Sequence, residues 1–182
     1  MSRRGRLIAI VGASGVGKDS VMQALVSARP DLHLVQRAIT RTAEAGGEVF
    51  EAVTPQAFRS RVAAGAFALS WQAHGLDYGI PRTVDAVLAA GHDALVNLSR
   101  DVLASAAARF PGMIVIQLTA DPATLAARLA ARGREAPADI ARRLARADAA
   151  LPDGITALVV DNSGPIEAAV TAILAHISSE KV

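Results

Sequence analysis

The chain has 182 residues, of which 52% are apolar and 20% charged, and its formal net charge at pH 7 is only +2. This length and composition predict one globular domain, residues 1–182, with a buried core. The absence of cysteine excludes disulfides and thiolate metal sites. With so few aromatic residues and no long apolar run, we expect a cytoplasmic protein that binds neither nucleic acid nor membrane.

The first predicted element is a strand, because residues 7–11 (LIAIV) form a short apolar run rich in branched side chains. Such a run is typical of a strand that is buried on both faces of a parallel sheet. Glycines follow at once, and Val21, Met22, Leu25 and Val26 then mark the apolar face of a helix. The sequence thus predicts a glycine-rich loop between a buried strand and a helix.

This loop has the spacing of a phosphate-binding loop, with Gly12, four further residues, Gly17 and then Lys18. Glycines allow backbone N–H groups to approach phosphate oxygens closely, and the helix N-terminus that follows favours an anion. Lysine is rare in this chain, since only Lys18 and Lys181 occur among its 19 basic residues, which favours a specific role for Lys18. The residues expected to bind a nucleotide phosphate are Gly12, Ala13, Ser14, Gly15, Val16, Gly17, Lys18, Asp19 and Ser20.

Asp19 departs from this pattern, because a serine or threonine that binds magnesium usually follows the lysine. A carboxylate is a good ligand for a hard cation, so we expect Asp19 to hold Mg²⁺ directly or through water. The alternative is that Asp19 only stabilises the first turn of the helix.

The segment 37–82 predicts a small subdomain inserted between core elements. It opens with Arg37 and Arg41, a spacing suited to phosphate but also found on ordinary surfaces. A helix is expected from Thr54-Pro55, a strand over 67–71 and a turn over 74–79.

Further strands are expected over 33–36, 94–98, 113–118 and 157–160, and a closing helix over 166–177. Strands that alternate with helices predict an α/β fold, a three-layer, doubly wound parallel sheet of five strands. Asn97 and Ser99 follow the strand at 94–98, at the end that faces ligands in such sheets.

Residues 128–146 hold a concentration of arginines on two short helical segments. Gly133 separates Arg132 from Arg134, an arrangement expected of a lid that moves arginines onto phosphates. An ordinary solvated helix pair is the alternative.

Together these motifs resemble the guanylate-kinase-like branch of the nucleoside monophosphate kinases. The phosphate loop, the 39–41 element, Tyr78-Gly79, the Arg132-Gly133-Arg134 lid and the run 140–144 occur in family order. The variants at 17–20, 69–76 and 95–100 are more similar to the ribose 1,5-bisphosphate phosphokinases of this branch, which act in phosphonate breakdown. The likeness covers nearly the whole chain and implies the P-loop fold, with 37–82 as the acceptor-binding insertion.

The resemblance also implies roles for single residues. Arg37, Ser70 and Ser99 stand where that family reads guanine with a hydroxyl and two carboxylates, so acceptor carboxylates are absent here. Arg41 and Tyr78 match positions that bind the acceptor phosphate, whereas a second phosphate arginine is replaced by Glu44. The implied substrate-binding residues are Arg37, Arg41, Ser70, Tyr78, Asn97 and Ser99, and the implied catalytic residues are Lys18, Arg132 and Arg134.

We therefore expect an enzyme that uses ATP and Mg²⁺ to phosphorylate ribose 1,5-bisphosphate to 5-phosphoribosyl 1-diphosphate. A phosphate acceptor carries no proton that must be removed, so His74 needs no acid–base role and is expected to pack or to contact a substrate hydroxyl. The alternatives are a guanylate kinase and a non-catalytic binding module of the same fold. A homodimer is compatible with the sequence.

Overall fold

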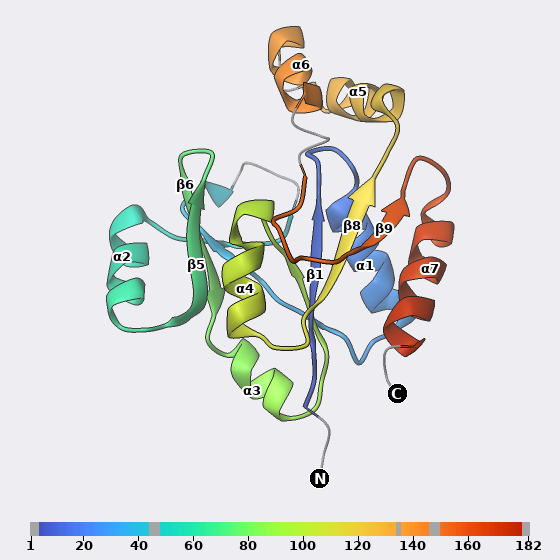
Figure 1. The fold of residues 1–182 in the computed structure, drawn as a ribbon. Helices are drawn as coiled ribbons and strands as arrows, with labels where there is room; N and C mark the ends of the chain where they lie inside the picture. Colours follow the sequence, from blue (N-terminus) through green and yellow to red (C-terminus); the bar gives the residue numbers. More distant parts are fainter. Residues whose placement is uncertain (1–3, 44–47, 134–135, 146–149, 180–182) are drawn as a thin grey trace.

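Two β-sheets organise the chain (Figure 1), in a computed structural model that describes residues 4–43, 48–133, 136–145 and 150–179. The larger sheet has five strands in the order β2-β7-β1-β8-β9, and every neighbouring pair is parallel. This confirms the predicted five-stranded parallel sheet. Its strands are β1 (Leu7–Gly12), β2 (His33–Leu34), β7 (Ala94–Asn97), β8 (Ile114–Thr119) and β9 (Leu158–Asp161).

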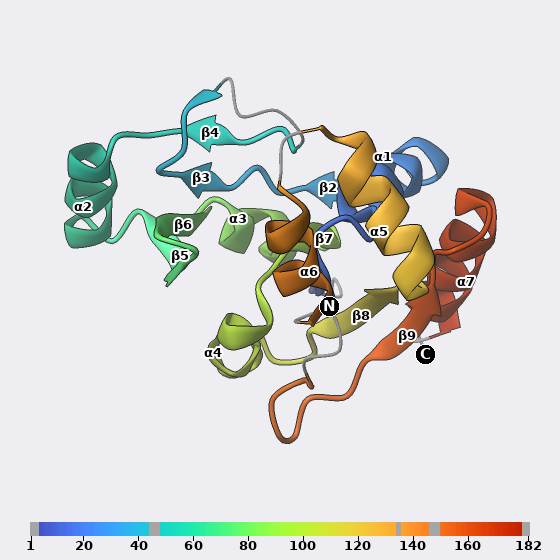
Figure 2. The ribbon, with the colours of Figure 1, turned by 90° about the horizontal axis from the view of Figure 1, so that it is seen from above.

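Helices cover both faces of this sheet, as Figure 2 shows from above. One face packs against α1 (Lys18–Ala28) and α7 (Ile166–Ser179), and the other against α3 (Val84–Ala89) and α4 (Leu103–Arg109). Strand β1 serves both apolar clusters, because Ile8 and Ile10 join the first and Ala9 and Val11 the second. The sheet is therefore doubly wound, as the sequence predicted.

The smaller sheet has four strands in the order β4-β3-β6-β5. It comprises β3 (Ala38–Ile39), β4 (Glu51–Ala52), β5 (Phe67–Ala73) and β6 (Leu76–Pro81), with α2 (Pro55–Ala63) beside it. Helix α2 begins as predicted, since Thr54 is its N-cap and accepts a hydrogen bond from the Ala57 N–H at 3.1 Å. All of these elements lie within residues 38–81.

The predicted turn over residues 74–79 is wrong, because strand β6 already begins at Leu76. The turn is confined to His74 and Gly75, whose φ angles of 53° and 73° suit a two-residue hairpin connection. His74 is exposed at this tip, so it is not packed in the core. The strand tolerates Gly79 because the Phe67 ring occupies the space above it, where a Cβ would lie 2.5 Å from a ring carbon.

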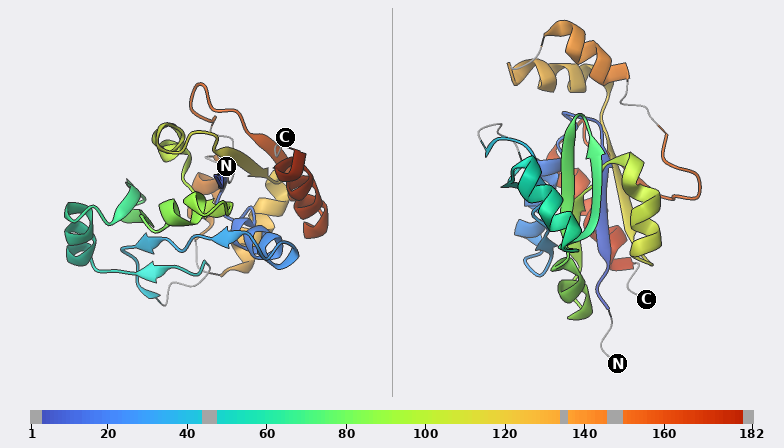
Figure 3. Two further views of the ribbon diagram at one scale, coloured as in Figure 1. Left: turned by 90° about the horizontal axis from the view of Figure 1, so that it is seen from below. Right: turned by 90° about the vertical axis from the view of Figure 1, so that its left-hand side faces the viewer.

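Helices α5 (Pro122–Ala131) and α6 (Pro137–Ala145) stand above the carboxyl edge of the larger sheet (Figures 1 and 3). Asp121 caps α5 by accepting from the Thr124 N–H at 2.8 Å. The helix ends at Arg132 as its C-cap, followed by Gly133 with a φ of 62°, so the predicted helix break is present. Within the described ranges, no helix has the length and apolar character needed to cross a membrane.

The buried carboxylate of Asp93 ties the opposite edge of the sheet together. It accepts from the Arg6 backbone N–H at 2.8 Å, from Arg6 Nη2 at 3.0 Å and from Arg29 Nη2 at 3.2 Å. Arg6 Nη2 also donates to the Ile177 carbonyl at 3.0 Å. Burial by itself would raise the pKa of Asp93, but the hydrogen bonds and charges of these arginines lower it to about 2.

We expect Asp93→Asn to lower the free energy of unfolding at pH 7 by about 2 kcal/mol, since the largely buried Arg6 guanidinium loses its Asp93 counter-charge and Arg29 keeps only the exposed Asp31. A carboxylate with a depressed pKa stabilises the fold above the unfolded pKa, and this contribution is lost as pH falls toward 2. Urea unfolding should therefore show a difference in the free energy of unfolding between variant and wild type that shrinks from pH 5 to pH 3.

Asp31→Asn, at the exposed partner of Arg29, is the control and should lower the free energy of unfolding by about 0.5 kcal/mol or less. A pH-independent difference for Asp93→Asn would contradict this account.

Candidate functional site

The predicted phosphate loop lies between β1 and α1, and its backbone requires glycine. Gly15 and Gly17 have φ angles of 86° and 98°, in the left-handed region that other residues avoid. A Cβ on Gly17 would lie 2.7 Å from Asn162 Nδ2, and one on Gly12 would lie 2.6 Å from the Leu118 carbonyl oxygen. The loop is thus packed against its neighbours, and glycine is needed for space as well as for conformation.

Two side chains from distant parts of the chain hold this loop at one atom, the Val16 carbonyl oxygen. It accepts from Arg128 Nη1 at 3.1 Å and from Asn162 Nδ2 at 2.8 Å. Arg128 Nη2 donates in addition to the Asn162 carbonyl at 2.8 Å. Arg128 therefore links helix α5 to the loop, a structural role that its position in an arginine-rich helix did not reveal.

Lys18 is the first residue of α1, and its side chain folds back over the loop. Its Nζ donates to the carbonyl oxygens of Gly12 at 2.9 Å and Ala13 at 3.0 Å. Burial lowers the pKa of the Lys18 ammonium from its ordinary value to about 8, and the nearby Arg37 charge acts in the same direction. A phosphate placed in the loop would favour the charged form, so this ammonium is suited to an anionic ligand.

Asp19 follows in the first turn of the same helix, whose N-cap is Gly17. Burial of its carboxyl group, together with the neighbouring Glu48 carboxylate, raises the pKa of Asp19. The charges of Lys18, Arg37 and Arg132 oppose this rise, which places all three within electrostatic reach of Asp19. Ser20, the last residue of the predicted loop set, is exposed.

Arg37 is buried beside this loop, with only 6% of its surface exposed. Its Nε donates to Glu48 Oε1 at 2.7 Å and its Nη2 donates to Glu48 Oε2, which gives a two-pronged ion pair. The guanidinium carbon lies 5.1 Å from the Tyr78 ring centroid and 6.0 Å from that of Trp71. We call the set Arg37, Glu48, Trp71, Tyr78 and Ser99 the Arg37 cluster.

Ser99 joins this cluster through Trp71, whose indole Nε1 donates to Ser99 Oγ at 3.0 Å. Ser99 lies just beyond β7, and Asn97, the last residue of that strand, is buried with 8% exposure. Both residues lie at the carboxyl edge of the larger sheet, next to the strand that carries the loop. The structure thus brings Tyr78, Ser99 and Arg37 together.

Arg41 lies near the end of β3, with its guanidinium carbon 4.3 Å from the Phe50 ring centroid. Its Nε and one Nη are buried, and within the described part of the chain they have no hydrogen-bond partner. A buried guanidinium with open donors is suited to an anion.

Ser70 is not brought to the Arg37 cluster. Its side chain is exposed and lines a hollow of about 410 Å³ with Phe58, Arg59 and Val62 on the α2 side of the small sheet. Neighbouring residues of a strand point to opposite faces, so Trp71 can face the cluster while Ser70 does not.

Of the two predicted lid arginines, the structure describes Arg132 alone. Arg132 is exposed, and Arg134 lies outside the described residues. On α6, Arg142 forms an exposed ion pair with Asp139.

Two members of the cluster, Glu48 and Trp71, were not among the predicted site residues. Glu48 follows a glycine-containing segment and reads as a surface carboxylate in the sequence. Only its ion pair with buried Arg37, which the structure shows, identifies Glu48 as a member of the cluster. For Trp71, the two-residue period of the predicted strand was the available signal, because it places Trp71 and Ser70 on opposite faces.

Comparison with known proteins identifies the family. Residues 4–180 match the guanylate kinase family. The chain is 50% identical over 179 residues to the ribose 1,5-bisphosphate phosphokinase PhnN of Ruegeria sp. (strain TM1040), covering 98% of this chain and 94% of that protein. It is 52% identical over 180 residues to the protein of the same name from Pseudomonas fluorescens (strain SBW25), covering 93% of each chain.

Among solved structures, a guanylate kinase from Anaplasma phagocytophilum has the same fold, with a TM-score of 0.71 at 16% identity over 100% of this chain and 88% of that one. The chain therefore belongs to the guanylate kinase family, and within it to the group whose curated members are named ribose 1,5-bisphosphate phosphokinase.

Proposed function

We propose that this protein transfers the terminal phosphoryl group of ATP to ribose 1,5-bisphosphate and so forms 5-phosphoribosyl 1-diphosphate. The observation that supports it most directly is the pairing of two cationic sites within electrostatic reach of each other. Lys18 marks the phosphate loop, and Arg37 lies in the adjoining cluster. The names of the close relatives agree with this assignment.

The phosphate loop is proposed to bind the donor nucleotide. The N–H groups of its glycines and of the first turn of α1 would bind the outer phosphates, and Lys18 would turn from the Gly12 and Ala13 carbonyls toward them. Arg128 and Asn162 would keep the loop in its binding conformation.

The acceptor is proposed to lie between this loop and the Arg37 cluster, with its phosphates held by Arg37 and Arg41. Tyr78, Asn97 and Ser99 would line the sugar. Ser70 is left out, because the alternation of exposed and partly buried residues along β5 places its side chain on the exposed face, opposite to Trp71.

The reaction needs no general base, because a phosphate monoester is largely dianionic at pH 7, with a second pKa near 6. An oxygen of the acceptor phosphate forms a bond to the γ-phosphorus of ATP, while the bond from that phosphorus to the β–γ bridging oxygen breaks and ADP leaves. Lys18 and the lid arginines Arg132 and Arg134 would stabilise the negative charge that builds up on the transferred group.

Magnesium is the metal that this chemistry implies, and Asp19 is suited to hold it. No described group of three or more acidic, histidine or cysteine side chains could bind a metal alone. Mg²⁺ in such enzymes is held by one or two carboxylates together with substrate phosphates, and Asp19, in the first turn of α1, offers hard oxygen donors of this kind. When bound, the ion would neutralise charge on the phosphates.

The substrate assignment is tested by offering the purified protein ATP and Mg²⁺ with either ribose 1,5-bisphosphate or GMP. We expect 5-phosphoribosyl 1-diphosphate as product and a loss of at least about a hundredfold in kcat for Lys18→Ala, because a charge that stabilises the transition state is removed. Brisk GDP formation without sugar phosphorylation would instead identify a guanylate kinase. A wild-type protein with no turnover on either acceptor would favour a binding module.

Lys18 should also give the enzyme a defined pH dependence. In the free protein its ammonium loses its proton as pH rises through about 8, so kcat/KM for ATP should fall above that pH. Nucleotide phosphates favour the protonated form, so ATP binding at pH 8.5 should take up a proton. Calorimetry in two buffers of different ionisation enthalpy measures this uptake, which should be absent in Lys18→Ala. Equal heats in both buffers for the wild type would show that Lys18 does not titrate there.

The role of Asp19 is tested through the magnesium titration of activity. Asp19→Ala should raise the Mg²⁺ concentration needed for half-maximal rate several-fold, since one anionic ligand is lost. Asp19→Ser, which restores the hydroxyl of the common pattern, should recover part of the affinity. If thermal stability falls in both variants while the magnesium dependence stays that of the wild type, Asp19 only stabilises the helix turn.

A further inference from the structure

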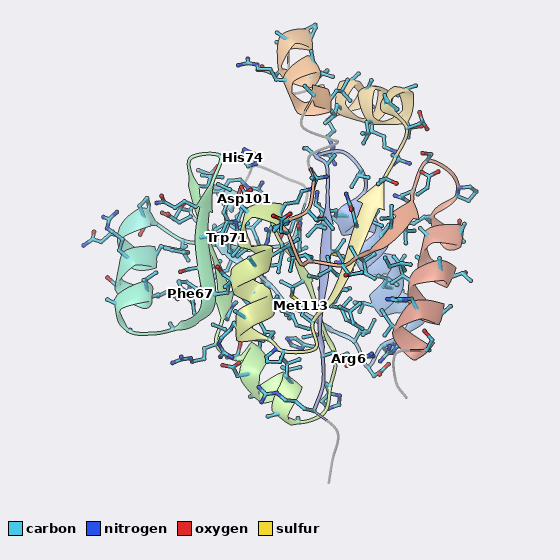
Figure 4. The ribbon with its side chains drawn as sticks, in the orientation of Figure 1. Arg6, Phe67, Trp71, His74, Asp101 and Met113 are labelled. Carbon is cyan, nitrogen blue, oxygen red and sulfur yellow. The ribbon has the colours of Figure 1, made fainter. Side chains whose placement is uncertain are left out.

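Trp71 connects the two sheets of the molecule at the edge of the proposed acceptor site. It lies on β5, which contacts α4 (Figure 4), and it packs partly buried against the apolar cluster on that side. Its indole N–H reaches across 28 positions of sequence to Ser99 Oγ at 3.0 Å. Because Ser99 follows β7 of the larger sheet, this hydrogen bond fixes the indole relative to the strands that surround the phosphate loop.

The indole also covers Tyr78. The two rings are nearly parallel, at 11°, with centroids 5.3 Å apart, and they face each other as a cross-strand pair of β5 and β6. Tyr78 is only 9% exposed, and the Arg37 guanidinium lies 5.1 Å from its ring centroid. One face of Tyr78 is therefore occupied by a protein side chain.

A purine base needs features that this cluster does not offer. It binds by stacking on a flat surface, and guanine in addition requires acceptors for its N1–H and N2 amino groups. In the described Arg37 cluster, the carboxylate of Glu48 is paired with Arg37, and Ser99 Oγ accepts from the indole. The indole already stacks on one face of the Tyr78 ring, so that face is closed to a base.

A pentose ring fits this surface better. Its C–H groups can lie against an indole edge, its hydroxyls can accept from or donate to groups such as the Ser99 O–H, and it needs no flat face for stacking. The phosphates that flank it would meet the cationic side of the cluster.

We propose that Trp71 is a specificity-determining residue of the acceptor site, held by Ser99 and Tyr78 so that it excludes a purine and admits a phosphorylated pentose. This inference rests on the proposed function and names the part of the chain that selects the acceptor. Ser99 then acts through Trp71 as a positioning residue.

The test compares kcat/KM for ribose 1,5-bisphosphate with kcat/KM for GMP. In Trp71→Ala the ratio should fall at least about tenfold toward GMP, while KM for ATP stays close to wild type. Trp71→Phe keeps an aromatic ring on Tyr78, so the ratio should fall less than in Trp71→Ala. Ser99→Ala and Trp71→Phe remove the same hydrogen bond, so each should raise KM for the sugar several-fold, and the double variant should be no worse than either alone.

Phe67→Leu is the matched control, since Phe67 lies on the same strand and stacks on Phe58 of α2 with centroids 4.8 Å apart. It should lower thermal stability and leave the acceptor ratio unchanged. An unchanged ratio in Trp71→Ala, or an equal shift in Phe67→Leu, would overturn the inference.

Fluorescence gives a readout that does not depend on turnover. Trp71 is the only tryptophan of the chain, so intrinsic emission reports on it alone. Adding ribose 1,5-bisphosphate without ATP should change this emission saturably, and Ser99→Ala should alter the change. If the wild type makes 5-phosphoribosyl 1-diphosphate but neither emission nor the Trp71→Ala ratio responds, this inference fails and the proposed function stands. If only GMP is phosphorylated, the proposed function itself fails.

Discussion

The burial of residues 8–11 of β1 is the constraint on which the site depends. Ile8, Ala9, Ile10 and Val11 have no exposed surface, and β7 and β8 pair with the strand on its two sides. A strand that is hydrogen-bonded on both edges and packed on both faces has one position, so the loop that starts at Gly12 leaves the sheet at a fixed point. The residues after β7 are fixed relative to that loop for the same reason, because the register pairs Ile10 with Asn97.

The buried ion pair of Arg37 and Glu48 complements this rigid edge. A guanidinium taken out of water without a counter-charge costs several kcal/mol, and here Glu48 supplies both acceptor oxygens. The cation is therefore in place before any substrate arrives, and its side-chain entropy has already been lost during folding. Any phosphate that binds Arg37 must share the guanidinium with Glu48 or displace it. The affinity for the acceptor therefore reflects the free-energy difference between the Arg37–phosphate and the Arg37–Glu48 pairs.

Sequence patterns predicted the elements whose residues carry their own signal. The core strands β1, β7, β8 and β9 each contain three or more consecutive apolar residues, and α2 and α5 begin with a capping residue followed by proline. Strand β6 was not predicted because Gly79 and Pro81 have low strand propensity. They lie in a strand only because β6 pairs with the neighbouring hairpin strand β5. Helix α4 was not predicted either, because it has few large apolar residues and therefore no clear helical periodicity. The Arg37 cluster was predicted only in part, because the pairing with Glu48 joins residues across a loop whose path no local pattern encodes.

The anchoring of the Val16 carbonyl has a consequence for the amide on its other side. A trans peptide unit is planar, so its C=O and the N–H of the next residue point in opposite directions. Because Arg128 and Asn162 fix the direction of the Val16 C=O by hydrogen bonds, they also fix the direction of the Gly17 N–H. Two side chains more than a hundred positions away thereby aim a main-chain donor that they never touch.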